Sequence, residues 1–198
     1  MEHVITHSDK NRALDILQEA FYQVPGIMWI IRSRKYRKQH LRLFLSFCFT
    51  ESAEKNGAYI TSDKNGVVLF YNLQSKSRPV LKFLRMIYLM IKVIGIKRSL
   101  RALKTRKIMD HVRPKKGWYG WFLATEKGVI GNRAGYEIKR DMFRIADEQN
   151  ENIYVETTDK RTMLLYKTIG FSEYAVRDHP YEDLNIWFMK REPNTVKT

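Results

Sequence analysis

The fold is decided by residues 118–171, which read WYGWFLATEKGVIGNRAGYEIKRDMFRIADEQNENIYVETTDKRTMLLYKTIGF. The apolar and aromatic runs Trp118–Thr125 and Ile153–Thr157 predict two strands. Between them, Tyr136–Glu148 predicts a helix, because its apolar residues recur at intervals of three and four. A strand, a Gly-containing turn, a helix and a second strand make a βαβ unit with a right-handed crossover.

Strand and helix signals continue on both sides of this unit. Toward the C-terminus, Arg161–Thr168 predicts a short helix, and two strands follow over Phe171–Val176 and Leu184–Met189. Toward the N-terminus, the predicted elements are the helices Asn11–Tyr22 and Arg32–Ser52 and the strands Tyr59–Thr61 and Val67–Tyr71, which flank Asn65-Gly66. An Asn-Gly pair between two strands is a strong hairpin signal.

Length and composition indicate one domain. A chain of 198 residues, 44% of them hydrophobic, fits a single core. We expect a helical and hairpin half over 1–116, a half that carries the chemistry over 117–191, and a loose tail over 192–198. The N-terminus lacks the segments of a signal peptide, and Cys48 has no disulfide partner. We therefore expect a cytoplasmic protein with a buried structural thiol.

Positive charge is concentrated between Lys76 and Lys116. This segment holds fourteen Lys and Arg residues against one acid, Asp110, and so carries 13 of the 15 net charges. Its apolar run Val80–Ile94 is too short and too charged to span a bilayer. Ile96–Met109 predicts a basic amphipathic helix with an apolar side, made of Ile96, Leu100, Leu103 and Ile108.

Two interpretations of this segment stay open. In the first, two helices pack on the sheet and leave a solvated basic back. In the second, the segment is a membrane-surface or partner helix. Its charge could attract nucleic acid, an anionic membrane or a phosphorylated cofactor.

From Trp118 to Met189 the chain resembles the GNAT superfamily of CoA-dependent N-acetyltransferases. The resemblance rests on Ala146-Asp147, Ile153–Thr157 and the Tyr-x-x-x-Gly-Phe signature of Tyr166–Phe171, which follow one another without gaps. Trp118-Tyr119 also looks like an aromatic pair found in one branch of the family. The resemblance implies an α/β (α+β) fold: a mixed, mostly antiparallel sheet with one parallel, splayed strand pair and helices on both faces.

The same resemblance implies an acetyl-CoA site. The main chain of Phe122, Leu123 and Thr125 would bind the pantetheine arm, and Thr162 stands where the family often carries Asn. The phosphate turn would comprise Ile130, Gly131, Asn132, Arg133, Ala134 and Gly135, at a helix N-terminus that favours anions. The turn departs from the family pattern, because Ile130 replaces Gln or Arg and Arg133 replaces the central Gly. Arg133 either obstructs the phosphates or reaches them as a guanidinium.

The implied reaction moves an acetyl group from acetyl-CoA to a primary amine, by direct attack in a ternary complex. Tyr166 stands at the family's thiolate acid, with a core tyrosine as the alternative interpretation. Glu156, on the face of its strand opposite Val155, is the first choice of general base, with a structural carboxylate as the alternative. Glu126 and His111 are weaker candidates for the base, and a water relay needs no dedicated side chain.

The sequence lacks the residues that a metal site, a nucleotide-binding loop or a serine nucleophile would need. The five histidines show no metal-ligand spacing, one cysteine cannot supply a thiolate site, and the sequence has no Walker loop or serine elbow, so we expect no metal. The acceptor would be a small-molecule or peptide amine. Nucleic acid is disfavoured because aromatic residues are few in the basic segment, and a homodimer stays open. Two alternative functions also stay open: a non-catalytic module with a decayed phosphate turn, and a basic binder of nucleic acid or anionic membranes.

Overall fold

A seven-stranded sheet in the order β1-β2-β3-β4-β5-β7-β6 organises the chain. The computed structural model describes residues 1–4, 6–31, 35–127 and 133–194. The strands are β1 Glu2–His3, β2 Ala58–Ile60, β3 Gly66–Asn72, β4 Trp118–Thr125, β5 Ile153–Thr157, β6 Ser172–Asp178 and β7 Asn185–Arg191. The helices are α1 His7–Phe21, α2 Pro25–Ile30, α3 Arg37–Ala53, α4 Pro79–Leu89, the π-helix η1 Met90–Ile94, α5 Ile96–Asp110, α6 Arg133–Glu148 and α7 Lys160–Thr168.

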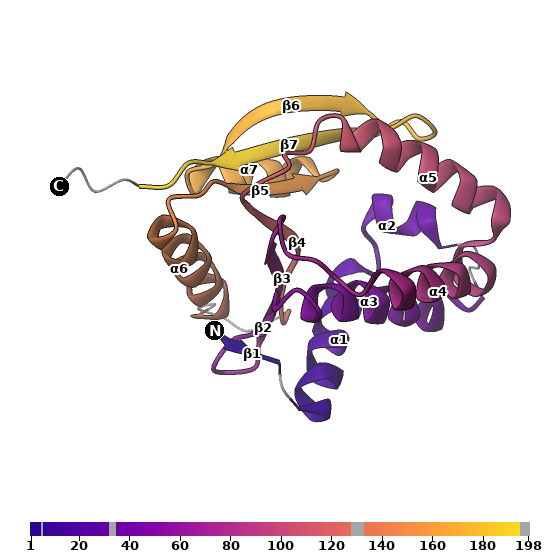
Figure 1. The fold of residues 1–198 in the computed structure, drawn as a ribbon, viewed down its shortest axis with the longest axis horizontal. Helices are drawn as coiled ribbons and strands as arrows, with labels where there is room; N and C mark the ends of the chain where they lie inside the picture. The colour runs from indigo at the N-terminus through magenta and orange to yellow at the C-terminus, as the bar shows by residue number, and fades with distance from the viewer. Residues whose placement is uncertain (5, 32–34, 128–132, 195–198) are drawn as a thin grey trace.

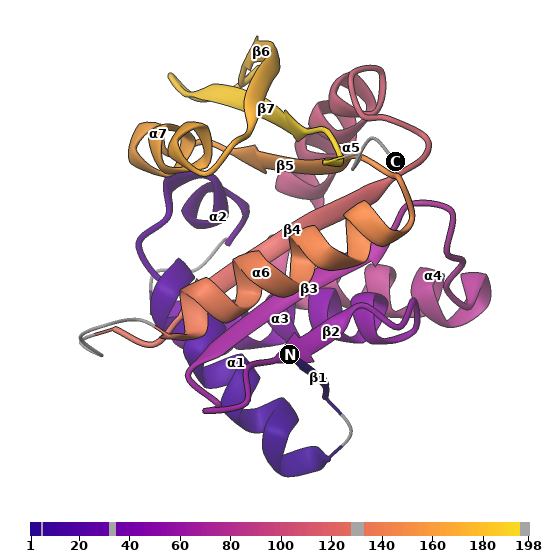
Figure 2. The same ribbon diagram turned by 90° about the vertical axis from the view of Figure 1, so that its left-hand side faces the viewer.

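Helices cover both faces of this sheet, as the sequence predicts. The helices α1 and α3 pack on one face of β3 and β4, and α6 packs on the other (Figure 1). Figure 2 looks onto the face that α6 crosses. Two apolar cores result: one beneath α1 and α3, with Leu17, Leu45 and Phe122, and one beneath α6 and α7, with Val155 and Met163.

Among the described strands, the one parallel pairing is short. The strands β4 and β5 pair at Trp118↔Ile153, Tyr119↔Tyr154 and Gly120↔Val155, whereas every other neighbouring pair of strands is antiparallel. Beyond Gly120, β4 continues to Thr125 along β3 alone. The predicted mostly antiparallel sheet with one splayed parallel pair is therefore confirmed.

A β-bulge lies where the two strands part. Leu69 pairs with Phe122 and Phe70 pairs with Gly120, so Trp121 is the extra residue of β4. A bulge bends its strand and increases the local twist. Gly120 also lets β5 approach closely, because a Cβ at this position would lie 3.0 Å from Val155 Cγ1. The bulge and this close contact together hold the point of divergence.

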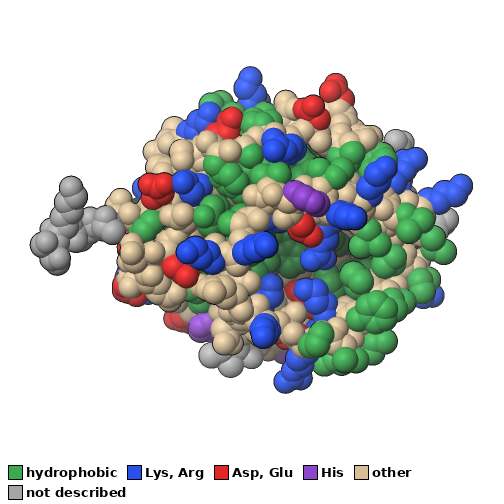
Figure 3. Space-filling view, turned by 45° about the horizontal axis from the view of Figure 1, so that its top comes forward, with side chains coloured by type: hydrophobic (Ala, Val, Ile, Leu, Met, Phe, Trp, Pro, Cys, Tyr) green, Lys and Arg blue, Asp and Glu red, His purple; other side chains and the backbone are tan. Residues whose placement is uncertain are grey.

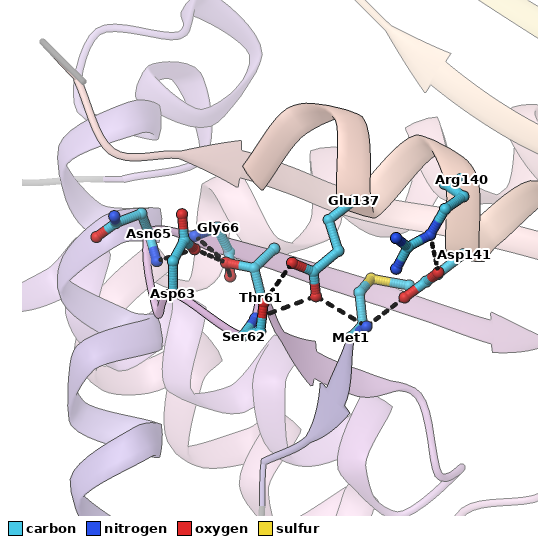
Figure 4. Close-up of polar contacts among 9 residues, drawn as sticks. All are labelled: Met1, Thr61, Ser62, Asp63, Asn65, Gly66, Glu137, Arg140 and Asp141. Atoms are coloured by element: carbon cyan, nitrogen blue, oxygen red, sulfur yellow. Dashed lines mark hydrogen bonds and ion pairs between the residues drawn. The ribbon is translucent and has the colours of Figure 1, made fainter. Parts of the chain in front are cut away.

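The helix α6 is tied to the first strands at its N-terminal half. The Met1 ammonium forms ion pairs with Asp141 and, at 2.9 Å, with Glu137. Glu137 also accepts hydrogen bonds from the backbone N–H and the hydroxyl of Ser62, which lies in the turn between β2 and β3 (Figure 4). These contacts fix the end of α6 that follows the predicted phosphate turn.

The end of α5 packs on the sheet through Met109, which is buried with Ile186 and Phe188 of β7, but the side of the helix predicted to face inward does not. The four residues predicted to face inward are Ile96, Leu100, Leu103 and Ile108, and they are 70, 61, 41 and 38% exposed. Both faces of the central strands are already covered, and the rest of α4 and α5 contacts α3, η1 and α2. Within the described ranges, no helix has the length and apolar character needed to cross a membrane.

Candidate active site

The backbone of β4 offers polar groups to the gap between β4 and β5. Successive residues of a strand direct their backbone N–H and C=O groups to opposite neighbours. The amide of Phe70 in β3 donates to Gly57 O, on the β2 side. The backbone groups of the preceding residue, Leu69, therefore point to Phe122 of β4. The backbone groups of Leu123 and Thr125 therefore point the other way, toward the gap. Of the three residues assigned to the pantetheine arm, Leu123 and Thr125 present their main chain to the gap, whereas that of Phe122 faces β3.

Glu156 sits on β5 immediately after the last residue paired with β4. Arg113, which precedes β4, donates from Nε to Oε1 at 2.5 Å and from Nη2 to Oε2 at 2.7 Å. The Glu156 side chain is 14% exposed and that of Arg113 is 29% exposed. Sequence reasoning missed Arg113, because nothing in the basic segment distinguishes this arginine from its neighbours.

Tyrosine side chains surround this ion pair. The Tyr119 hydroxyl lies beside Glu156, and the Arg113 guanidinium lies 5.9 Å from the Tyr119 ring centre. Burial, with the negative charge of Glu156, holds the pKa of Tyr119 well above its usual value of 10.0. Burial likewise raises the pKa of Tyr71 and of Tyr174. These phenols stay neutral at physiological pH, so Glu156 and Arg113 are the charged groups of the cluster.

Tyr166 lies on the opposite side of β5 from Glu156. Its ring packs in the core beneath α6 and α7, 5.3 Å from the Phe171 ring, and this core also holds Val155. Burial raises the pKa of Tyr166 to about 12. With this pKa the phenol is protonated at neutral pH, and in the described part of the chain its hydroxyl has no hydrogen-bond partner, so it is able to donate.

The helix that carries Tyr166 begins at an aspartate cap. Asp159 accepts hydrogen bonds from the backbone N–H of Arg161 and of Thr162. The Thr162 hydroxyl also donates to Asp159 Oδ2, at 2.7 Å. Thr162, assigned to the cofactor from the sequence, is thus engaged in the cap of α7.

The predicted phosphate turn is described only at its end. Ile130, Gly131 and Asn132 lie outside the described residues. Arg133 is the first residue of α6 and is exposed. Ala134 is buried against Gly66, where an added Cβ would lie only 2.9 Å from the Ala134 Cβ. The first turn of α6 contains no acid. The exposed arginine and the helix N-terminus form a positive end that can hold an anion.

The two weaker base candidates are engaged elsewhere. Glu126, which follows β4, forms an ion pair with Arg12 at 2.7 Å. The His111 ring nitrogen Nδ1 lies 2.7 Å from the backbone oxygen of Lys107, and this histidine is exposed.

Cys48 is fully buried, which raises the pKa of its thiol well above the usual value. Among the described residues, no cluster of three metal-ligating side chains occurs.

A pocket of about 510 Å³ opens between α2, α5 and the turn from β6 to β7. Its lining is mixed, and comprises Pro25, Met28, Trp29, Ile31, Arg37, Arg98, Glu182, Asp183 and Leu184. The start of α2 lies against the end of β5, because a Cβ at Gly26 would be 3.2 Å from Thr158 Oγ1. The helix α2, which lines the pocket, therefore also lies against the residue that follows β5.

Comparisons with known proteins identify the fold. No protein-family model matches the chain, and no curated protein matches its sequence. Several solved structures match over nearly the whole length of both chains. A protein described as histone acetyltransferase HPA2 and related acetyltransferase, from Corynebacterium glutamicum, is 21% identical, with a TM-score of 0.64 over 98% of this chain and 96% of that one.

The C-terminal condensation domain of Ebony, in complex with β-alanyl-dopamine, is 14% identical, with a TM-score of 0.63 over 95% of this chain and 96% of that one. PH1933 from Pyrococcus horikoshii OT3 is 12% identical, with a TM-score of 0.59 over 98% and 97%. At these identities the likeness concerns the fold. The chain has the GNAT fold that its sequence motifs imply.

Proposed function

We propose that this chain is an N-acyltransferase that moves an acetyl group from acetyl-CoA to a primary amine. One observation carries the proposal: β4 and β5 diverge at a bulge, with Glu156 on one face of β5 and Tyr166 on the other. A thioester in this gap would meet a carboxylate from one side and a neutral phenol from the other. The names of two similar structures, an acetyltransferase and a condensation domain in complex with β-alanyl-dopamine, agree with transfer to an amine.

Binding of the acyl donor would use the main chain of β4 and the end of α6. The backbone groups of Leu123 that face the gap would hold an amide of the pantetheine arm. Arg133 and the first N–H groups of α6 would hold the phosphates, since a helix N-terminus and a guanidinium both favour anions. Orientation of the thioester in the gap would itself contribute to the rate, because it converts a bimolecular step into a local one.

In the reaction, the amine nitrogen attacks the thioester carbonyl carbon. A C–N bond forms, the C–S bond breaks, and the amine releases a proton. Glu156 is proposed to take this proton, because an ionised carboxylate has about four acceptor positions and Arg113 occupies one on each oxygen. Tyr166 is proposed to give a proton to the departing thiolate.

The acceptor would enter through the pocket beside α2. Its lining carries two guanidinium groups, of Arg37 and Arg98, and two carboxylates, of Glu182 and Asp183. The carboxylates favour approach of a protonated amine, and the arginines favour an anionic group on the same molecule. A small-molecule or peptide amine that carries both charges would therefore fit best.

The test is calorimetric titration with acetyl-CoA, followed by an amine screen that monitors thiol release. Saturable one-to-one binding and amine-dependent thiol release are the expected results. Dephospho-CoA and a short oligonucleotide serve as controls for charge alone. Binding that is shared with the oligonucleotide and disappears in moderate salt would contradict the proposal and leave a basic scaffold with this fold.

A further inference from the structure

Exposed apolar side chains gather on α4, η1 and α5. Of the large apolar and aromatic residues that are exposed in the described chain, seventeen in all, eleven lie between Val80 and Ile108. Six of these eleven are at least 56% exposed, namely Val80, Phe83, Leu84, Ile91, Ile96 and Leu100. Single exposed apolar residues are ordinary on a protein surface, but such a concentration on neighbouring elements marks an interaction surface. We name it the α4–α5 surface.

The helix α4 is oriented with charged residues inward. Lys82 forms an ion pair at 3.2 Å with Glu51 of α3, which is 2% exposed. One turn further along α4, Arg85 forms an ion pair at 2.6 Å with Glu54 of α3. Because these pairs hold the charged side of α4 against α3, the side that contains Val80 and Leu84 faces outward.

Lysine and arginine side chains border these apolar residues. The exposed ones comprise Lys92, Lys97, Arg101, Lys104, Arg106 and Lys107. Asp110 is the single acid between Lys76 and Lys116, and Arg106 and Arg113 already contact it. Figure 3 shows hydrophobic side chains along the right-hand side of this face, where α4 and α5 lie in Figure 1, with Lys and Arg around them.

We propose that the α4–α5 surface docks on an anionic lipid bilayer. Its exposed aliphatic and aromatic side chains would enter the boundary between headgroups and acyl chains, and the surrounding cations would contact lipid phosphates. In this proposal the protein lies on the bilayer surface; none of the described helices is long and apolar enough to span it. This inference does not depend on the acyl transfer proposed above.

Charge and chemistry favour a bilayer over two other partners. A second copy of the chain would bring two strongly positive segments together, which opposes association. Nucleic acid would satisfy the cations, but its phosphates and sugars would leave the aliphatic side chains against polar groups. An anionic bilayer satisfies both parts of the surface at once.

Docking would also orient the candidate site. Arg98 of α5 lines the pocket beside α2, and its Nη1 donates to Ile31 O at 2.8 Å. The α4–α5 surface and the pocket therefore share one helix. A bilayer against α5 would bring the pocket close to amines held at the membrane surface.

The test is flotation of the purified chain with vesicles of phosphatidylcholine alone and of phosphatidylcholine mixed with phosphatidylserine. We expect binding to the mixed vesicles and little to the neutral ones. The double variant Leu84→Ser with Leu100→Ser should weaken this binding by about 10²-fold, because each buried leucine contributes about a factor of ten. The matched control is Leu164→Ser with Leu165→Ser, which removes two leucines of similar exposure from α7 and should bind as the parent chain does.

Three outcomes would overturn the inference. The first is absence of binding to the mixed vesicles. The second is equal loss in the control pair, which would reflect general damage to the fold. The third is loss of vesicle binding to a competing oligonucleotide, with no effect of the leucine changes, which would indicate a nucleic-acid surface. A dimer that only the Leu84 and Leu100 changes dissociate, in a chain that does not float with vesicles, would assign the surface to a second copy.

Discussion

Arg113 binds Glu156 through both oxygens of the carboxylate, with donor–acceptor distances of 2.5 and 2.7 Å. The two residues are 43 positions apart, one before β4 and the other on β5. The pair thus joins the two strands that diverge at Gly120 and Val155. A carboxylate held at two points keeps a fixed orientation, which a group that must receive a proton from a bound amine requires.

Glu156→Gln should lower kcat by about 10²–10⁴-fold, which is the usual contribution of a general base. The amide fills the same space as the carboxylate but cannot accept the proton. Steady-state rates of thiol release check this, and binding of acetyl-CoA to the variant serves as the control. A rate within a few-fold of the parent chain, with the fold intact, would return Glu156 to a purely structural role.

Arg113→Lys should lower kcat by roughly tenfold while leaving the KM for acetyl-CoA unchanged. Lysine keeps the positive charge but cannot reproduce the two-point geometry of a guanidinium. Arg113 is a positioning residue, so the change should appear in kcat and not in the KM for acetyl-CoA. A thermal melt monitors stability. A lysine variant with parental kcat would show that orientation of Glu156 by Arg113 is unimportant.

Tyr166→Phe should lower kcat by about 10²-fold or more, the low end for a general acid, with little loss of stability. The phenol packs against Phe171, and phenylalanine preserves this packing. Burial raises the pKa of Tyr166 from the ordinary tyrosine value of 10.0 to about 12. Deprotonation of Tyr166 should therefore not lower the rate of the parent chain as the pH rises to 10.0. Rates over this pH range and a melting curve test both statements. An unchanged kcat in the phenylalanine variant would identify Tyr166 as a core residue.

Arg133→Ala should weaken acetyl-CoA binding by about tenfold, because a hydrogen bond to a charged group contributes about 1.5–3 kcal/mol. Arg144→Ala is the matched control, since Arg144 is also an arginine of α6 but pairs with Glu148 near the other end of the helix. Calorimetry on both variants gives the comparison. Tighter binding after removal of Arg133 would mean that its side chain obstructs the phosphates.

The sequence predicts the elements around the site because local patterns define them. The strands Trp118–Thr125 and Ile153–Thr157 appear with the bounds predicted, and α6 begins three residues earlier than expected, at Arg133. The alternation that puts Val155 in the core also puts Glu156 on the other face. These features depend on neighbouring residues, so periodicity is sufficient to find them.

Contacts between segments that are distant in the sequence could not be predicted from such local patterns. Arg113 is one of fourteen basic residues in its segment, and only the tertiary fold brings it to Glu156. The spacing of Ile96 and Leu100 identifies an apolar side of α5 but not what covers it. The charged pairs between α4 and α3 are likewise tertiary, and they determine which side of α4 faces outward.

Asp159→Ala should destabilise the chain by about 1 kcal/mol at neutral pH, the usual cost of losing an N-cap. The hydrogen bond from Thr162 holds the pKa of Asp159 below its usual value of 3.8. A carboxylate whose pKa is lowered by folding stabilises the native state above 3.8 and loses this contribution as pH falls through the folded-state pKa. Asp159→Asn keeps an acceptor at every pH, so the stability of the parent chain relative to this variant should decline in acid. Urea unfolding of the three proteins above and below pH 3.8 measures the difference. A constant difference would show that Asp159 does not stabilise α7 as an anion.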